Sequence, residues 1–121
     1  MNKRSFLAAA AAALTIFTTS ASFASDPVLT AGMDAAYPPF GSQDRKTREY
    51  VGYDVDIIRA IAKHAGFKVV VRNLAFDGLI PALKTGAIDI AINDITISEE
   101  RAKSVDFSHR YYIAGLGVVV N

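Results

Sequence analysis

The sequence predicts an α/β fold in which a mostly parallel sheet is flanked by helices. Residues 28–33 and 67–72 are apolar, β-prone runs, and residues 55–65 between them repeat apolar side chains at helical spacing. A strand, a helix and a strand of these lengths form a parallel crossover unit. Residues 76–84 then form a second helical pattern, and residues 88–92 a third apolar run. The chain therefore alternates strand and helix, as a parallel sheet requires.

The first strand leads into Pro38 and Pro39, which cannot continue a sheet ladder. This rigid turn holds the aromatic side chains beside it at defined angles. We expect Tyr37 to face a ligand pocket, because its hydroxyl keeps a polar tip, and Phe40 to cover the local core. Residues 41–49 are polar and charged, which predicts an exposed, hairpin-like excursion.

The helix predicted over residues 55–65 has a signal at each end. The Asp54 carboxylate is placed to cap its amino end, and Gly66 to end it in the left-handed conformation. Lys63 and His64 in the last turn suit the negative end of the helix dipole. The side chains expected to face the core are Val55, Ile58, Ile61, Ala62 and Ala65.

The helix predicted over residues 76–84 follows the second strand. Asp77 is its expected cap, and Pro81 is expected within about the first turn, where a missing N–H has no helical acceptor. Phe76 would then sit just before the helix, at the carboxyl end of a strand. We expect it to form a pocket wall rather than a core edge.

Residues 93–101 follow the third strand and carry the main candidate for ligand recognition. Ser98, followed by two glutamates, is a typical helix start. Arg101 would lie in the first turn of that helix, near the carboxyl end of the strand, where α/β sheets bind ligands. Its guanidinium can give a carboxylate two parallel charge-assisted hydrogen bonds. A surface ion pair with Glu99 or Asp106 is the alternative.

The first 24 residues have the features of an export signal. Lys3 and Arg4 form its positive end, residues 6–17 are an apolar run with one Thr, and residues 22–24 fit a cleavage site. The run is shorter than the roughly 20 residues of a membrane-spanning helix. We therefore expect a signal peptide over 1–24 and a folded lobe over 25–121 in the periplasm.

Composition excludes several classes of function. Without Lys3 and Arg4, eleven basic residues remain against twelve acidic ones, a net charge near −1. The basic residues are scattered, so nothing indicates nucleic-acid binding. There is no cysteine for a disulfide framework, and neither histidine lies in a motif, so we expect no metal or other cofactor.

A series of short motifs runs through the chain from the first predicted strand onward. They are AGMD at 31–34, YPPF at 37–40, VGYDVD at 51–56, FDGLIPAL at 76–83, GAID at 86–89, TISEER at 96–101, VDFS at 105–108 and YY at 111–112. In this order and spacing they resemble the amino-terminal half of the bacterial extracellular solute-binding proteins of family 3, the polar-amino-acid receptors of ABC importers. The resemblance implies two α/β lobes, joined by a hinge, that close on one amino acid.

The resemblance also implies roles for single residues. Arg101 would take the α-carboxylate of the ligand, helped by Thr96 and by backbone N–H groups. A backbone carbonyl near Asp94, with an acid of the second lobe, would meet the α-amino group. Two aromatic rings would sandwich the ligand side chain, and one carboxylate would accept a hydrogen bond from it. The two rings are those of Tyr37 and Phe76, and the carboxylate is that of Asp34.

Two departures from the family pattern bear on the ligand. Asn93 and Asp94 stand where many members carry Gly, Ser or Ala; a carboxylate there could favour a cationic ligand, bind the ammonium or point to solvent. Nearly all of the second lobe is missing, so we expect a fragment that binds weakly or not at all alone. The aromatic pair and Asp34 suit a side chain that is polar or cationic and can be stacked, such as that of glutamine, histidine, arginine, lysine or cystine.

The leading hypothesis is a periplasmic, monomeric receptor that delivers an amino acid to the membrane permease of an ABC importer and performs no bond chemistry. One alternative is a dehydratase on the same fold, with Asp94 or Asp34 as the general acid for a cyclohexadienyl substrate. A second alternative is the ligand-sensing domain of a signalling receptor.

Overall fold

The computed structural model describes residues 25–115 and 117–119. The predicted signal peptide, 1–24, lies outside the described residues. Within residues 25–115 and 117–119, the main sheet has three parallel strands in the order β5-β1-β6. These strands are β1 (Val28–Met33), β5 (Lys68–Asn73) and β6 (Ile90–Ala91).

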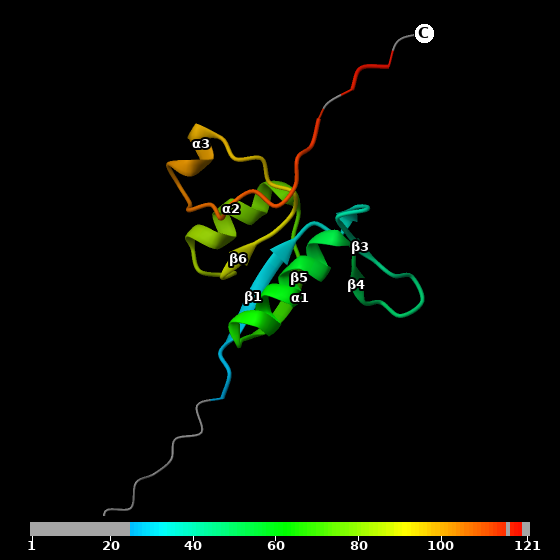
Figure 1. Ribbon diagram of the computed structural model, residues 1–121, viewed down its shortest axis with the longest axis vertical. Helices are drawn as coiled ribbons and strands as arrows, with labels where there is room; N and C mark the ends of the chain where they lie inside the picture. The colour runs from blue at the N-terminus through cyan, green and yellow to red at the C-terminus, as the bar shows by residue number, and fades with distance from the viewer. Residues whose placement is uncertain (1–24, 116, 120–121) are drawn as a thin grey trace, which may run out of the picture.

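Two helices cover this sheet. Helix α1 (Tyr53–Ala65) packs against β5, and α2 (Phe76–Lys84) packs against β6 and β1 (Figure 1). A third, short helix, α3 (Glu99–Ala102), follows β6. The predicted α/β fold, a parallel sheet flanked by helices, is confirmed. None of the helices in the described part of the chain has both the length and the apolar character needed to span a membrane.

The third strand is shorter than predicted. Strand β6 contains two residues, against the predicted run of 88–92. One further backbone hydrogen bond to β1 lies on each side of β6: the Asp89 N–H donates to the Thr30 carbonyl at 2.9 Å, and the Ile92 N–H donates to the Gly32 carbonyl at 3.0 Å. The Ile88 amide instead donates to the carbonyl of Ala82 in α2, at 3.4 Å. This bond turns the chain towards α2 before the strand begins.

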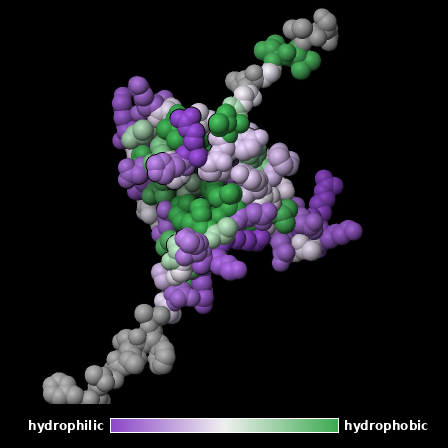
Figure 2. All heavy atoms as spheres, viewed as in Figure 1, coloured by the Kyte–Doolittle hydropathy of each residue, from purple (hydrophilic) through white to green (hydrophobic). Residues whose placement is uncertain are grey.

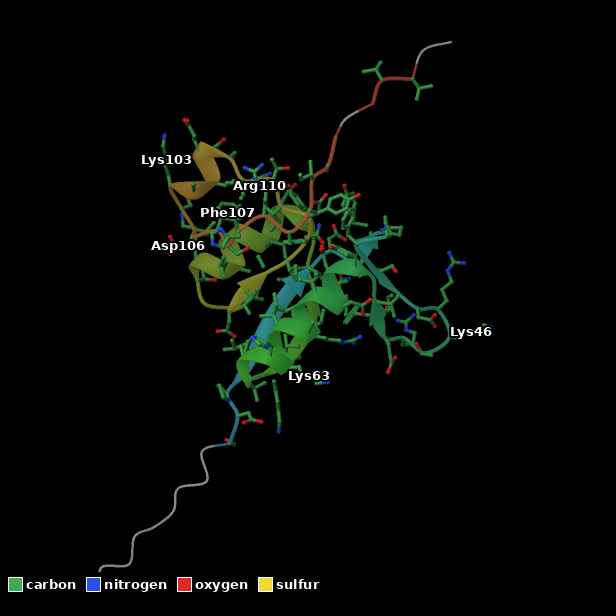
Figure 3. All side chains as sticks on the ribbon, in the orientation of Figure 1. Lys46, Lys63, Lys103, Asp106, Phe107 and Arg110 are labelled. Carbon is green, nitrogen blue, oxygen red and sulfur yellow. The ribbon has the colours of Figure 1, made fainter. Side chains whose placement is uncertain are left out.

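The predicted excursion forms a small antiparallel sheet. Its strands pair in chain order: β2 (Ala36–Tyr37), β3 (Gly41–Gln43) and β4 (Tyr50–Val51). Asp44 closes the turn between β3 and β4, because its Oδ1 accepts from the N–H groups of Lys46 and Thr47, both at 2.8 Å. The bonds from Thr47 and Lys46 lower the pKa of Asp44. The turn projects from the body of the molecule, with Lys46 at its tip (Figure 3).

The amino end of α1 is capped by backbone carbonyls and not, as predicted, by the Asp54 carboxylate. The helix begins at Tyr53, and Gly52 is the cap residue. Its first two N–H groups donate to the carbonyls of Pro39 and Phe40, each at 3.0 Å. Because the preceding turn supplies these acceptors, the Asp54 side chain is released to the interior, where it is fully buried.

The carboxyl end of α1 is as predicted, with Gly66 left-handed at φ 77° and Lys63 and His64 in the last turn. The predicted inner face is too wide, since Ile61 is 48% exposed and Ala65 is also exposed. In the described part of the chain, the sheet beneath the helix has three strands and covers a narrower stripe of the helix surface. In the space-filling view, a patch of hydrophobic residues lies near the middle of the molecule, beside α1 (Figure 2). The buried apolar side chains are Ala31, Met33, Val55, Ile58, Ala62, Leu79, Ile88 and Ile92.

Two predicted details of α2 are wrong. Asp77 lies in the first turn and caps nothing, and Pro81 is the sixth residue, inside the helix and past its first turn. The helix starts before Asp77 because the Asp34 carboxylate, from the loop after β1, accepts the Phe76 N–H at 3.2 Å. An acceptor from a distant segment therefore sets the first residue of α2.

Candidate functional site

Arg101 lies in α3, which follows β6 after the loop of residues 92–98. Ser98 begins this helix as predicted, and its hydroxyl accepts the Arg101 N–H at 3.3 Å. The guanidinium donates from Nη1 to the Thr96 carbonyl at 3.0 Å. Its central carbon also lies 5.5 Å from the centroid of the Phe76 ring. One contact is with a carbonyl and the other with an aromatic ring; within the described residues, neither is the alternative ion pair with Glu99 or Asp106.

These contacts orient the guanidinium without neutralising its charge. A carbonyl dipole and an aromatic face both attract a cation, yet neither is a carboxylate. One of five N–H donors is used by Thr96, so the remaining fork can still receive a carboxylate. The side chain borders a hollow of about 320 Å³. The hollow is lined by Phe76, Asp77, Ile80, Glu100, Arg101 and Ser104.

Asp34 joins three of the predicted site segments. Its Oδ2 accepts the Phe76 N–H at 3.2 Å, and its Oδ1 accepts the Ala36 N–H at 2.9 Å. Its own N–H donates to Oδ1 of Asn93, at 2.8 Å. Asn93 is 2% exposed, so this amide acts as an internal brace between β1 and β6. Each carboxylate oxygen of Asp34 therefore already accepts a hydrogen bond from a backbone N–H. That Asp34 also accepts a hydrogen bond from a ligand stays a prediction.

Asp94 has a left-handed backbone, with φ 46°. Its N–H donates to the Tyr111 hydroxyl at 3.1 Å, and that hydroxyl donates to Oδ1 of Asp54 at 2.8 Å. Within the described residues, the buried Oδ2 of Asp54 has no hydrogen-bond partner. Burial raises the pKa of Asp54, and the Tyr111 hydrogen bond opposes that rise. Burial, then the bond to Asp54, raises the pKa of Tyr111.

The Asp54–Tyr111 pair was not predicted from the sequence. A usable signal was present, because Asp54 precedes Ile58 and Ala62 by one and two helical turns and so lies on the same buried stripe. The bond to Tyr111 joins residues 57 positions apart, and no local pattern predicts such a contact.

Tyr37 belongs to an aromatic cluster and not to the walls of the hollow beside Arg101. Its ring stacks on Phe40, with centroids 5.6 Å apart, and it is 48% exposed. Phe40 also meets Tyr112 edge-on at 5.0 Å and Tyr53 at 6.2 Å. Phe40 thus lies at the centre of the cluster, and Tyr37 lies at its rim.

The predicted site residues divide between two hollows. Phe76 and Arg101 line the smaller one, and Asn93, Asp94 and Thr96 line a cavity of about 510 Å³ between the β6 region and residues 105–114. Asp34 and Tyr37 line neither. Side chains suited to a metal do not gather in threes within the described residues.

The fold is that of an α/β lobe with a parallel sheet flanked by helices. The chain belongs to the bacterial extracellular solute-binding proteins, family 3, whose family model matches residues 29–121. This match confirms the resemblance seen in the sequence motifs.

Named relatives are amino-acid-binding proteins. The chain is 42% identical over 90 residues to the L-arginine-binding protein of Pseudomonas aeruginosa, covering 74% of this chain and 34% of that protein. It is 36% identical over 92 residues to the L-cystine-binding protein TcyJ of Escherichia coli, covering 76% and 34% respectively. The chain therefore spans about a third of the length of the curated relatives it matches.

Solved structures agree with this fold. An ancestral arginine-binding protein bound to arginine matches with a TM-score of 0.69 and 46% identity, covering 73% of this chain and 38% of that one. The arginine-bound form of domain 1 from TmArgBP matches with a TM-score of 0.66 and 42% identity, covering 70% and 67%. An ancestral cyclohexadienyl dehydratase matches with a TM-score of 0.65 and 33% identity, covering 70% and 35%.

Proposed function

We propose that this chain is the amino-terminal lobe of a periplasmic, monomeric receptor that binds a polar or cationic amino acid and delivers it to an ABC importer. The observation that carries this proposal is the placement of Arg101. Its guanidinium is oriented by the Thr96 carbonyl and the Phe76 ring beside an open hollow, with donors left for a ligand. Relatives named for binding arginine, cystine and histidine support an amino acid as the ligand.

The α-carboxylate of the ligand pairs with Arg101 through the free side of the guanidinium fork. The α-amino group lies towards Asp94, whose carbonyl or carboxylate accepts from it. Phe76, which is 38% exposed, gives the ligand side chain an aromatic surface. A second lobe then closes over the ligand by a hinge motion and excludes water.

Two acidic side chains favour a cationic ligand. Asp77 and Glu100 line the same hollow as Arg101. Their negative charges attract an ammonium or guanidinium group on the ligand side chain, while the ligand carboxylate pairs with the Arg101 guanidinium. A relative named for arginine and a solved ancestral protein bound to arginine agree with this preference.

The chain by itself is expected to bind weakly, because one lobe provides about half of the contacts around the ligand. The solved arginine-bound form of domain 1 from TmArgBP supports binding by a single lobe. A method that detects millimolar affinity is therefore needed.

Amide chemical-shift titration of the ¹⁵N-labelled chain provides that method. L-Arginine is expected to shift the amides around Phe76, Thr96 and Arg101, and L-glutamate to shift them far less. Arg101→Ala should lose the response while keeping the far-UV spectrum and the unfolding midpoint. A matched control is Arg59→Ala, on an exposed position of α1. An equal response in the Arg101→Ala and parent chains would show that the guanidinium does not hold the ligand.

The dehydratase alternative is tested with the same protein. The likeness to an ancestral cyclohexadienyl dehydratase motivates an assay with prephenate. Binding of arginine without turnover of prephenate is the expected result. Turnover that is lost on substitution of Asp94 or Asp34 would instead support the enzyme.

A further inference from the structure

One hydroxyl group connects the ligand-binding loop to the core. The Tyr111 hydroxyl meets Asp94, 17 positions away, and Asp54, 57 positions away. It therefore ties the loop after β6 to the first turn of α1 through a side chain that follows α3. This contact is separate from the guanidinium site, since Tyr111 does not line the hollow beside Arg101.

The direction of the two hydrogen bonds is fixed by chemistry. A hydroxyl has one proton, and at Tyr111 it is donated to the Asp54 carboxyl at 2.8 Å. The lone pairs that remain face the Asp94 N–H, 3.1 Å away. Asp54 is 0% exposed and the Tyr111 ring lies 6.2 Å from that of Tyr53, so the acceptor for the Asp94 amide is held in place.

The loop needs such an anchor because its backbone is strained and has no ladder of its own. Asp94 is left-handed, at φ 46°, which costs a non-glycine residue stability. Residues 93–98 form neither helix nor strand. Asn93 holds the start of the loop through the Asp34 N–H, and Ser98 holds its end by capping α3.

The loop also sets the position of Arg101. The Thr96 carbonyl, two residues beyond Asp94, accepts from the guanidinium at 3.0 Å. A change at Asp94 therefore reaches the guanidinium through two residues of backbone and one hydrogen bond.

We infer that Tyr111 is a positioning residue for the amino-acid site, which fixes the Asp94 amide and through it the Thr96 carbonyl that orients Arg101. The consequence for affinity rests on the proposed function, whereas the consequence for the loop does not. Asp54 is the partner that holds the Tyr111 hydroxyl in its bridging position.

Tyr111→Phe tests this inference, and Tyr112→Phe is its matched control. Phenylalanine keeps the ring and removes only the hydroxyl. Tyr112 is the neighbouring tyrosine of the aromatic cluster, and its hydroxyl makes no hydrogen bond within the described residues. Hydrogen exchange of the Asp94 amide and L-arginine titration are measured on the full chain for the parent and both variants.

The parent chain should protect the Asp94 amide from exchange. Tyr111→Phe should lose that protection, shift the Thr96 and Arg101 resonances, and weaken L-arginine binding about fivefold, the effect of one typical hydrogen bond. Tyr112→Phe should change none of these readouts. Equal loss of affinity in both variants would assign the effect to general packing and overturn the inference.

The inference and the proposed function can fail separately. If the parent chain shows no response to L-arginine, yet Tyr111→Phe frees the Asp94 amide and shifts the Arg101 resonance, the loop anchor stands and the proposed function receives no support from this chain. If the parent binds arginine through Arg101 while Tyr111→Phe matches it in exchange and affinity, the anchor fails alone. Should Tyr111→Phe not fold, an unprotected Asp94 amide in the parent chain is sufficient to overturn the inference.

Discussion

Gly52→Ala should destabilise the chain more than Gly66→Ala or Gly78→Ala. A Cβ at this position would lie 2.3 Å from the Phe40 carbonyl oxygen and 2.9 Å from that of Pro39. Both atoms are backbone, so the clash cannot be relieved by rotating a side chain. The backbone angles, φ 131° and ψ 173°, also belong to a region that is essentially restricted to glycine.

The magnitude follows from these contacts. Strain at such a backbone position costs about 1–3 kcal/mol. The same carbonyls accept the first two N–H groups of α1, and each of these hydrogen bonds is worth about 1 kcal/mol when it is displaced. The expected loss is about 3–5 kcal/mol, a large fraction of the roughly 5–15 kcal/mol that a small domain has in total.

Urea unfolding of the parent chain and three variants measures this loss. Gly66→Ala is the control for positive φ alone, since φ is 77° and nothing lies within 4 Å of the added atom. It should cost about 1–2 kcal/mol. Gly78→Ala, inside α2 with open space around it, should stabilise by about 0.5–1 kcal/mol. A Gly52→Ala chain that unfolds within 1 kcal/mol of the parent would refute the packing of the 38–40 turn onto α1.

Two further predictions concern the buried polar groups. Burial raises the pKa of Asp54 above 3.8, so the contribution of this carboxyl to stability is full below that pH and is lost as the pH rises through the raised pKa. In urea unfolding across this range, Asp54→Asn should therefore gain stability relative to the parent chain as the pH increases. A difference between the two chains that stays constant with pH would contradict this prediction. Asn93→Ala should lower the free energy of unfolding by about 1–3 kcal/mol, because it removes the buried acceptor of the Asp34 N–H. In urea unfolding, a change below about 0.5 kcal/mol at an equal denaturant slope would contradict that role.

The elements that the sequence predicted well are those whose signals are local. Strand 28–33 and the start of α3 at Ser98 agree with the structure, because apolar runs and a capping hydroxyl act on their immediate neighbours. The two helix caps assigned to Asp54 and Asp77 were wrong for one reason. In both helices the first N–H groups meet acceptors from a distant part of the chain.

The candidate site follows the same division. The Arg101 and Thr96 contact spans five positions and lies within one motif, so the sequence brought these residues together. The packing of Arg101 on Phe76 was not predicted, because the sequence placed the two residues separately, each near the end of a strand. The bridge from Asp94 through Tyr111 to Asp54 joins three separate segments of the chain, and only the folded chain reveals it.

The contact between Arg101 and a ligand carboxylate is tested most directly by comparing L-arginine with agmatine, the same molecule without its carboxylate. The parent chain should bind L-arginine about ten- to hundredfold more tightly than agmatine, the range expected for a charge-assisted pair. In Arg101→Ala this preference should disappear, because the group that reads the carboxylate is gone. A preference of the same size in both chains would contradict the account.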